Sequence, residues 1–379
     1  MPAALLVLAA HALHVSSPPP NLAGADASAL FTEAAAIASA ATPSDAELLR
    51  VPSLLQQVFR LDEERLISTE EIDGMRRVVN VTCMQPALDY DGERGHSLFN
   101  DELLALPRRP GRRCTDGACT GACSRVFRRE FADALECELL IQHVSALMPT
   151  DDDKLKHDVS LEDAAAACAD GAEGAATALL RMLRLVERMR RFLAREYGVP
   201  LRTLRPRLAF ANRIHAPRVI EELDVGDLHA DECSDPTYHY SGVLYLNAPP
   251  ALVKGGGSDS AAGRDAVPSG DYTGGDLCFV DEGGNRLLRP EVGMIAAFSS
   301  GWENLHHVTP VFEGTRFACP MFFTTQPPPD VEEGDAPSNG FGGDRAARDR
   351  ALCRGLGLVR GATEEERAAV LTHWASFFE

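Results

Sequence analysis

The residues best suited to chemistry in this chain are two histidines, one aspartate and one arginine. A single residue separates His229 from Asp231, and His306 and Arg316 follow later in the chain, ten residues apart. On a strand, His229 and Asp231 point to the same face, because strand side chains alternate with a period of two. Two imidazoles and one carboxylate occupy one face of a divalent iron and leave the other face open, and an arginine beyond them offers a planar fork for a carboxylate. This combination favours oxygenase chemistry over a structural metal.

The spacing of His229 and Asp231 is by itself a weak indication of a site. The chain has 11 histidines and 56 acidic residues, so such a pair is expected by chance, and a polar strand end in water would explain it. The context is more informative. A loop over 233–236 and a strand-rich region follow the pair, and His306 stands at the head of another expected strand pair.

Short strands in the second half of the chain are the elements that must position these residues. Five apolar runs bounded by turn residues are typical of strands, namely 208–214, 240–246, 277–280, 293–298 and 316–323. Several such strands predict a sandwich or jelly roll. Residues 251–275 are polar and Gly-rich, which predicts a flexible loop between strands, able to serve as a lid over an extended peptide. Gly274-Gly275 at its end predicts a strand-opening turn rather than a phosphate cradle, since no helix pattern follows.

The first half of the chain has helical periodicity. We expect an amphipathic helix over 45–77, another over 127–148, and one or two longer helices over 160–197. The helix over 127–148 is inferred from apolar residues at helical spacing, namely Phe131, Leu135, Leu139, Ile141 and Val144.

Composition excludes two classes of function. The formal net charge is -19 and basic residues occur only in short pieces such as Arg108-Arg109, so nucleic acid binding through phosphate neutralisation is not expected. No stretch reaches the roughly 20 apolar residues that span a bilayer, so no membrane span is expected. With 379 residues, 45% of them hydrophobic, the chain can bury a substantial core.

Three features lean toward the secretory pathway or endoplasmic reticulum. The apolar run 3–10 leads into a small-x-small triplet at 10–12, as in a signal peptide, but it lacks preceding basic residues. Three cysteines within 114–123 do not have zinc-site spacing, so they predict disulfides in a secreted protein and free thiols in a cytoplasmic one. Asn80-Val81-Thr82 is a glycosylation sequon. A cytoplasmic location stays open as the alternative.

Five motifs together are far more specific than any one of them. They are His229-x-Asp231-x-Cys233, Tyr240-Ser241-x-Val243-Leu244-Tyr245-Leu246-Asn247, Gly274-Gly275-Asp276-Leu277-x-Phe279, Phe298-Ser299-Ser300-Gly301-x-Glu303-Asn304-x-His306-x-Val308 and Val311-x-x-Gly314-x-Arg316. With these motifs the sequence resembles the iron(II)- and 2-oxoglutarate-dependent dioxygenases, and most closely the prolyl 3-hydroxylase (leprecan) branch of the prolyl hydroxylases. The resemblance covers about residues 205–325.

The resemblance implies a fold, cofactors and a reaction. The implied fold is α+β, with a double-stranded β-helix (jelly-roll) catalytic core and flanking helices. In that family pattern His229, Asp231 and His306 hold Fe(II), and Arg316 binds the distal carboxylate of 2-oxoglutarate. The implied reaction consumes molecular oxygen, decarboxylates 2-oxoglutarate to succinate and hydroxylates a residue of a peptide or protein, with proline expected as that residue and L-ascorbate as a further cofactor.

Two tyrosines are candidates for the co-substrate pocket. Tyr240 and Tyr245 have opposite parity on their expected strand, so at most one should face the pocket, and core packing would explain either. Many relatives place a serine two residues after the arginine, where this chain has Ala318.

The choice between His306 and His307 is open on strand geometry. The family spacing His-x-Val-x-x-Val-x-x-Gly-x-Arg selects His306. A plain two-residue turn at Glu313-Gly314 would instead put Arg316 on the face of His307, whereas a three-residue turn or a bulge near Pro310 restores His306. We predict His306 as the ligand.

The expected organisation is a signal or leader over 1–44, a helical and Cys/Gly-rich region over 45–124, and a dioxygenase domain over 125–326. That domain comprises supporting helices over 125–200 and a β-core over 201–326, and a linker with a C-terminal helix follows over 327–379.

Two alternatives to a prolyl hydroxylase remain. One is a 2-oxoglutarate dioxygenase that acts on another residue or a small molecule. The other is a cupin-like metal-binding jelly roll without turnover. Arg316 separates this second alternative from the enzymes, since a non-catalytic barrel has no need of a carboxylate fork beside the metal.

Overall fold

The computed structural model describes residues 26–40, 42–86, 108–110, 123–149, 154–217, 228–235, 237–250, 271–281 and 283–325. The expected signal segment before residue 26, most of the expected loop over 251–275 and the expected C-terminal helix lie outside these residues.

The described chain forms helices and antiparallel sheets, so the predicted α+β class is confirmed. The main sheet has the order β1-β4-β11-β7-β13-β6-β5, and β8 pairs with β13. Its strands are β1 (Arg76–Val79), β4 (Arg125–Arg128), β5 (Lys156–Ser160), β6 (Arg205–His215), β7 (Tyr240–Tyr245), β8 (Tyr272–Gly274), β11 (Ile295–Ser299) and β13 (Val311–Thr324). A smaller sheet has the order β10-β9-β12 and consists of β9 (Leu277–Phe279), β10 (Arg286–Leu288) and β12 (His306–Val308). A third, two-stranded sheet pairs β2 (Met84–Pro86) with β3 (Arg108–Pro110).

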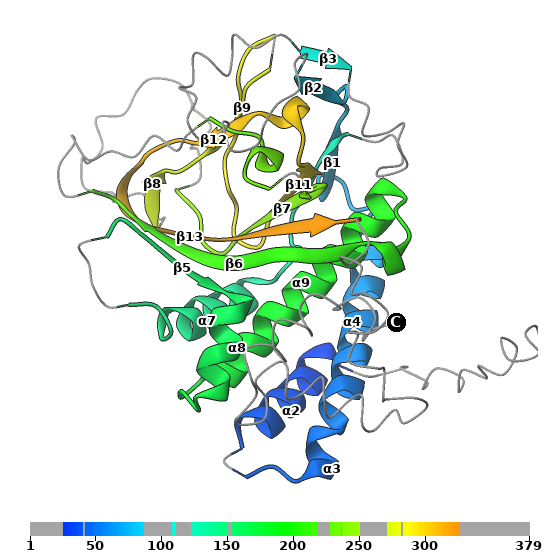
Figure 1. Ribbon diagram of the computed structural model, residues 1–379, viewed down its shortest axis with the longest axis vertical. Coiled ribbons are helices and arrows are strands. Elements are labelled where there is room, and N and C mark those ends of the chain that lie inside the picture. The colour runs from blue at the N-terminus through cyan, green and yellow to red at the C-terminus, as the bar shows by residue number, and fades with distance from the viewer. Residues whose placement is uncertain are drawn as a thin grey trace, which may run out of the picture.

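The main sheet is covered on both faces. Helices lie against one face, and the β9-β12 sheet lies over the other (Figure 1). On β11, Ile295 and Ala297 pack into the helix-side core, while Ala296 and Phe298 pack into the cluster between the two sheets. A strand buried on both faces reads as a continuous apolar run, which is why 293–298 shows no alternation in the sequence.

Helix α9 (Ala175–Tyr197) is the main helix beneath the sheet. It ends at Gly198, whose φ of 64° is a left-handed conformation that favours glycine at a helix end. The helix lies so close to β7 that a Cβ atom on Gly242 would stand 2.7 Å from the sulfur of Met189. The sheet that carries the functional residues therefore rests directly on α9.

The other helices complete this layer. They are α2 (Ala27–Ser39), α3 (Asp45–Leu48), α4 (Arg50–Ser68), α7 (Ala134–Ser145) and α8 (Leu161–Ala169). The predicted helices over 160–197 are confirmed as α8 and α9, and Ser160 with Asp163 forms a capping box at the start of α8. In the described part of the chain, no helix is long and apolar enough to cross a membrane.

Three sequence-based expectations about the first half are wrong. The segment expected to be a signal or leader, 1–44, contains α2. Phe31 of this helix is buried in the main core, so residues 27–39 belong to the folded body. The expected helix over 127–148 begins instead with β4, which pairs with both β1 and β11, and only α7 is helical. Leu135, expected on its apolar face, is 62% exposed. The expected helix over 45–77 ends at Ser68 and is followed by β1.

A buried ion network ties α4 to α7 and α9. Asp62 of α4 accepts hydrogen bonds from Arg184 at 2.7 and 2.8 Å and from Arg188 at 2.7 and 3.0 Å. Arg188 also donates to both carboxylate oxygens of Glu136 at 2.8 Å. Burial raises the pKa of Asp62, but the charges and hydrogen bonds of Arg188 and Arg184 outweigh it and lower the pKa to about 2. The network joins segments that are distant in sequence within one core.

Candidate metal and co-substrate site

Backbone pairing brings His229 and His306 together. The two residues form an isolated antiparallel bridge, in which His229 N donates to His306 O at 3.0 Å and His306 N donates to His229 O at 2.9 Å. Asp231 begins a short 3-10 turn, Asp231–Cys233. The expectation that His229 and Asp231 share a strand is therefore wrong: a single bridge and a turn place them on the same side.

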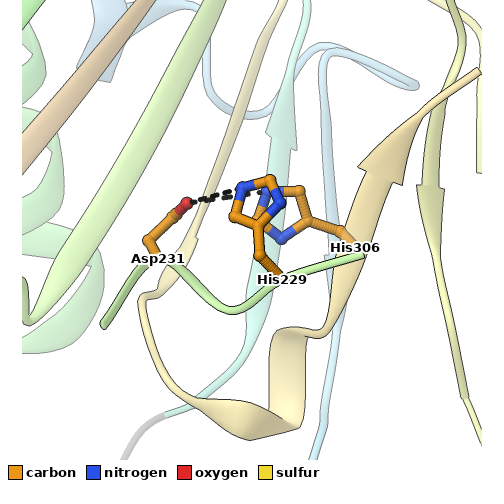
Figure 2. Close-up of side chains that lie close together, drawn as sticks. All are labelled: His229, Asp231 and His306. Atoms are coloured by element: carbon orange, nitrogen blue, oxygen red, sulfur yellow. Dashed lines mark ion pairs between the residues drawn. The ribbon is translucent and has the colours of Figure 1, made fainter. Parts of the chain in front are cut away.

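The three side chains converge in space (Figure 2). The Oδ1 atom of Asp231 lies 3.4 Å from Nε2 of His229 and 3.7 Å from Nε2 of His306. The two imidazole rings have centroids 4.5 Å apart. One donor atom from each residue lies within 4.8 Å of the others, so the three can face one ion.

The structure brings His306, and not His307, to this cluster. His306 is 5% exposed, whereas His307 is half-buried and pairs with Cys278 of β9. The two-residue turn at Glu313-Gly314, the alternative that would have favoured His307, does not form, because β13 continues through these residues. The strand breaks after Val308 and the register shifts between Val311 and Glu313. This irregularity places His306 on the face of Arg316.

The surroundings of His306 favour its neutral form. Burial lowers the pKa of His306 to about 4, although the carboxylate of Asp231 opposes that shift. Its Nδ1 lies 2.7 Å from the backbone oxygen of Asn304. A carbonyl can only accept, so Nδ1 carries the proton and Nε2 keeps its lone pair toward Asp231. The rings of Phe298 and Phe279 pack against the imidazole at 5.1 and 5.8 Å.

Asp231 is held in its ionised form. It is 5% exposed, and burial raises its pKa, but the net pKa lies below the ordinary value because of His306, His229 and a hydrogen bond from Ser241. A buried carboxylate between two imidazoles is a donor set that attracts a divalent cation. The residues present therefore fit a metal ion.

Arg316, the candidate residue for binding the co-substrate, lies on β13. It is 2% exposed, and its Nε donates to the backbone oxygen of Gly275 at 3.1 Å. Among the described residues, no carboxylate forms an ion pair with it, although burying an unpaired charge costs free energy. Its guanidinium lies 5.5 Å from the ring centre of Tyr245, whose buried hydroxyl has no hydrogen-bond partner in the described residues. A buried cation beside a free hydroxyl fits an incoming carboxylate.

The two candidate tyrosines face opposite ways, as strand parity predicts. Tyr245 packs between the sheets beside Arg316. Tyr240 instead packs into the helix-side core, with its ring 4.8 Å from that of Tyr197 on α9. The expectation that Tyr240 contacts a co-substrate is therefore wrong. Ala318 is fully buried and provides no hydroxyl there.

Sequence reasoning missed Tyr272 and the contact of Gly275 with Arg316. Tyr272 belongs to β8, within the segment expected to be a flexible loop, and burial raises its pKa to about 12 against the opposing charge of Arg316. A Cβ on Gly275 would stand 2.9 Å from both Arg316 Cδ and a ring carbon of Tyr272. Gly274 ends β8 and Gly275 follows it, both with positive φ, of 78° and 68°. The signal lay in Gly275, where the positive φ and the close approach of Arg316 and Tyr272 both require a glycine.

Known proteins resemble this chain in part of its length. No family model matches it. The 2-oxoglutarate and iron-dependent oxygenase domain-containing protein 3 of Xenopus tropicalis is 36% identical over 99 residues, which are 26% of this chain and 25% of that protein. Prolyl 3-hydroxylase 3 of Mus musculus is 28% identical over 130 residues, or 34% of this chain and 15% of that protein. Over these stretches the chain is similar to 2-oxoglutarate- and iron-dependent oxygenases.

These oxygenases confirm the resemblance predicted from the motifs. The chain spans about a quarter of the length of the Xenopus relative and less of the prolyl 3-hydroxylase. Among solved structures, a viral collagen prolyl hydroxylase from Paramecium Bursaria Chlorella virus-1 has 16% identity and a TM-score of 0.36, covering 58% of this chain and 95% of that chain.

Proposed function

We propose that this chain is an Fe(II)- and 2-oxoglutarate-dependent dioxygenase that hydroxylates a peptidyl residue, with proline as the expected residue. One observation carries the proposal: the three-residue metal cluster and Arg316 both lie against the apolar cluster between the main sheet and the β10-β9-β12 sheet. His306 packs on Phe279 and Phe298 of that cluster, and Arg316 packs beside Tyr245 of the same cluster. A metal site alone would not require the buried guanidinium.

His229, Asp231 and His306 are the proposed iron ligands. When bound there with 2-oxoglutarate, Fe(II) supplies oxidative decarboxylation and C–H hydroxylation by molecular oxygen. The chain contributes a fixed geometry. The backbone bridge between the two histidines sets their separation, and the proton on Nδ1 of His306 leaves its Nε2 free to bind.

Arg316 is the proposed anchor of the co-substrate. Its Nε is engaged by Gly275, which orients the guanidinium and leaves the remaining N–H groups for a carboxylate. The Tyr245 hydroxyl, unpartnered among the described residues, is placed to donate to the same carboxylate. Burial of both groups excludes water, so each charge-assisted hydrogen bond there is stronger than it would be in solution.

The proposals of a double-stranded β-helix and of a proline-containing substrate draw on the similar proteins. We propose that the two packed sheets form the double-stranded β-helix of this family, since β7, β11 and β13 face β9 and β12 across one apolar cluster. A proline-containing peptide or protein is the proposed substrate, because prolyl 3-hydroxylases are among the relatives. L-ascorbate remains a prediction from the resemblance.

The secretory pathway or endoplasmic reticulum is the proposed location. A disulfide joins Cys83 to Cys123, and disulfides persist in oxidising compartments. The sequon residue Asn80 is exposed, and its side chain accepts a hydrogen bond from Ser124 at 3.2 Å. Cys114 and Cys119 lie outside the described residues.

The test is mass spectrometry of a proline-containing, collagen-like peptide panel incubated with the protein, Fe(II), ascorbate and 2-oxoglutarate, with succinate measured in the same tube. We expect a gain of one oxygen on proline that requires 2-oxoglutarate and is lost in Asp231→Ala. Succinate without a modified peptide would contradict the proline assignment and retain the dioxygenase. Neither product, from protein shown to hold iron, would favour a non-catalytic metal-binding barrel.

A further inference from the structure

Arg125 is a buried arginine that reaches the candidate metal site from outside the segment carrying the motifs. It is 1% exposed and belongs to β4, where it shares a sheet face with Phe127 and points toward the smaller sheet. Its guanidinium makes a two-point ion pair with Asp281 at 2.7 and 3.0 Å. It also lies 4.1 Å from the ring centre of Phe279.

The same guanidinium binds the turn that precedes His306. Arg125 Nε donates to Oδ1 of Asn304 at 2.6 Å, and its Nη2 donates to the backbone oxygen of Glu303 at 2.9 Å. The amide of Asn304 in turn donates to the backbone and hydroxyl oxygens of Ser299 at 2.8 and 3.0 Å. Both ends of the Asn304 side chain are therefore fixed, and this residue cannot rotate without losing buried hydrogen bonds.

The backbone oxygen of Asn304 is the acceptor for Nδ1 of His306, at 2.7 Å. Arg125 thus acts on the imidazole along two routes. One runs through Asn304 to Nδ1, and the other runs through Phe279, which packs against the same ring at 5.8 Å. Asp281 fixes the arginine at the end of β9, beside the strand that carries His306.

We propose that Arg125 is a positioning residue of the metal centre, which fixes the tautomer and orientation of His306 through Asn304. This inference rests on the proposed function, because His306 is taken as an iron ligand. Among the described residues, the hydrogen bonds of Arg125 go to Asn304, Glu303 and Asp281, and none goes to a proposed metal ligand. Partners of this outer kind are worth about 10- to 100-fold in metal affinity.

The chain contains a matched control for this proposal. Arg128 lies on the same strand and is 2% exposed, but it points to the helix side and donates to Thr69. Arg125→Met and Arg128→Met each remove one buried guanidinium from β4. Both should lower the thermal midpoint, so stability alone does not distinguish positioning from packing.

Metal affinity and the imidazole signal do distinguish them. We expect Arg125→Met to raise the Kd for Co(II), a stable substitute for Fe(II), by about 10-fold or more and to change its visible absorption, whereas Arg128→Met leaves both near the wild-type values. In the metal-free protein, nitrogen-15 spectra of His306 should show the Nδ1-protonated tautomer in wild type and Arg128→Met, and a tautomer mixture in Arg125→Met. Equal effects of the two substitutions, or no effect of Arg125→Met, would overturn the proposal.

Two further variants keep the test decisive if Arg125→Met does not fold. Asp281→Asn weakens the ion pair with Arg125 and also the one with Arg286. Asn304→Ala removes the acceptor of Arg125 Nε together with the two hydrogen bonds to Ser299. Each should change the His306 spectrum in the same direction as Arg125→Met. Wild-type protein that binds no Co(II) would refute the proposed function, while the tautomer measurement would still decide the role of Arg125.

Discussion

His229 and His306 are hydrogen-bonded to each other through both of their backbone groups, at 3.0 and 2.9 Å. Their spacing is therefore set by main-chain pairing that needs no metal. Structural zinc sites differ, since there the fold itself forms with the ion. We expect the metal-free protein to be folded and to take up a metal without refolding.

Replacing Asp231 tests the donor set. Asp231→Ala removes the only acidic group of the three-residue cluster, so we expect the Co(II) Kd to rise by at least about 100-fold, beyond the effect of an outer partner. The circular dichroism of the metal-free variant should match wild type, because the histidine bridge remains. Titration of apo protein measures this, and retained stoichiometric binding would rule out the metal assignment.

Arg316 should affect the co-substrate and not the metal. Arg316→Ala removes a charge-assisted, two-point anchor, worth about 1.5–3 kcal/mol per such bond, so we expect the 2-oxoglutarate Kd to rise by at least about 100-fold. Arg316→Lys should recover only part of this, because an ammonium lacks the planar fork. Anaerobic titration of the Co(II)-loaded protein with 2-oxoglutarate gives the Kd. A matching loss of metal affinity would show that Arg316 is structural.

Gly275 should act through Arg316. A methyl group there would meet Arg316 Cδ and a ring carbon of Tyr272, both at 2.9 Å, at a φ of 68°. We expect Gly275→Ala to weaken 2-oxoglutarate binding with little change in Co(II) affinity, since the guanidinium must move. Gly284→Ala is the control: it also has a positive φ, of 116°, but has open space around it. If both variants weaken the co-substrate equally, backbone strain and not the displacement of Arg316 is the cause.

Asp62 should make the stability of the protein depend on acid pH. Its folded pKa of about 2 lies below the ordinary 3.8, so its stabilisation is present above about pH 4 and is lost as the pH falls toward 2. The difference corresponds to about 2 kcal/mol. Asp62→Asn should therefore lose less stability between pH 5 and pH 2 than wild type. At pH 7 it should be less stable by about 3–5 kcal/mol, because a buried ion pair is broken.

Denaturant unfolding at several pH values measures both effects. The control variant is Glu63→Gln, which removes a partly exposed ion-pair partner of Arg191. It should leave the acid dependence of wild type intact. An Asp62→Asn variant with that same dependence would contradict the role assigned to the network.

The metal cluster was predictable from residue types and motif spacing, while its local geometry was not. His229, Asp231 and His306 were all found, yet the strand expected at His229 is a single bridge followed by a turn. Parity counting could not choose between His306 and His307, because the answer depends on an irregular register before Arg316, and a bulge shifts every following side chain by one face. The motif spacing selected His306 correctly, because it compares residue positions between related chains and needs no assumption about the strand geometry between them.

Residues that act from outside the motifs were not predictable. Arg125 lies two residues before the run expected to be helical, and it belongs to a strand that pairs with β1 on one side and β11 on the other. In the sequence, Asn304 is only one residue of a motif, with no contact assigned to it. Only the folded structure shows that its side chain lies between Arg125 and the turn carrying His306.

The helices α2 and α4 share one hydrophobic core with the sheet that carries the site, and Asp62 of α4 neutralises Arg184 and Arg188 inside it. A shortened protein that starts at β4 would keep every proposed ligand and yet leave those two guanidiniums facing a single carboxylate in an opened core. The stretches that match the relatives are 26% and 34% of the chain. The smallest autonomous folding unit is thus considerably larger than the part that similarity marks out, and any shortening for expression should retain α2 onward.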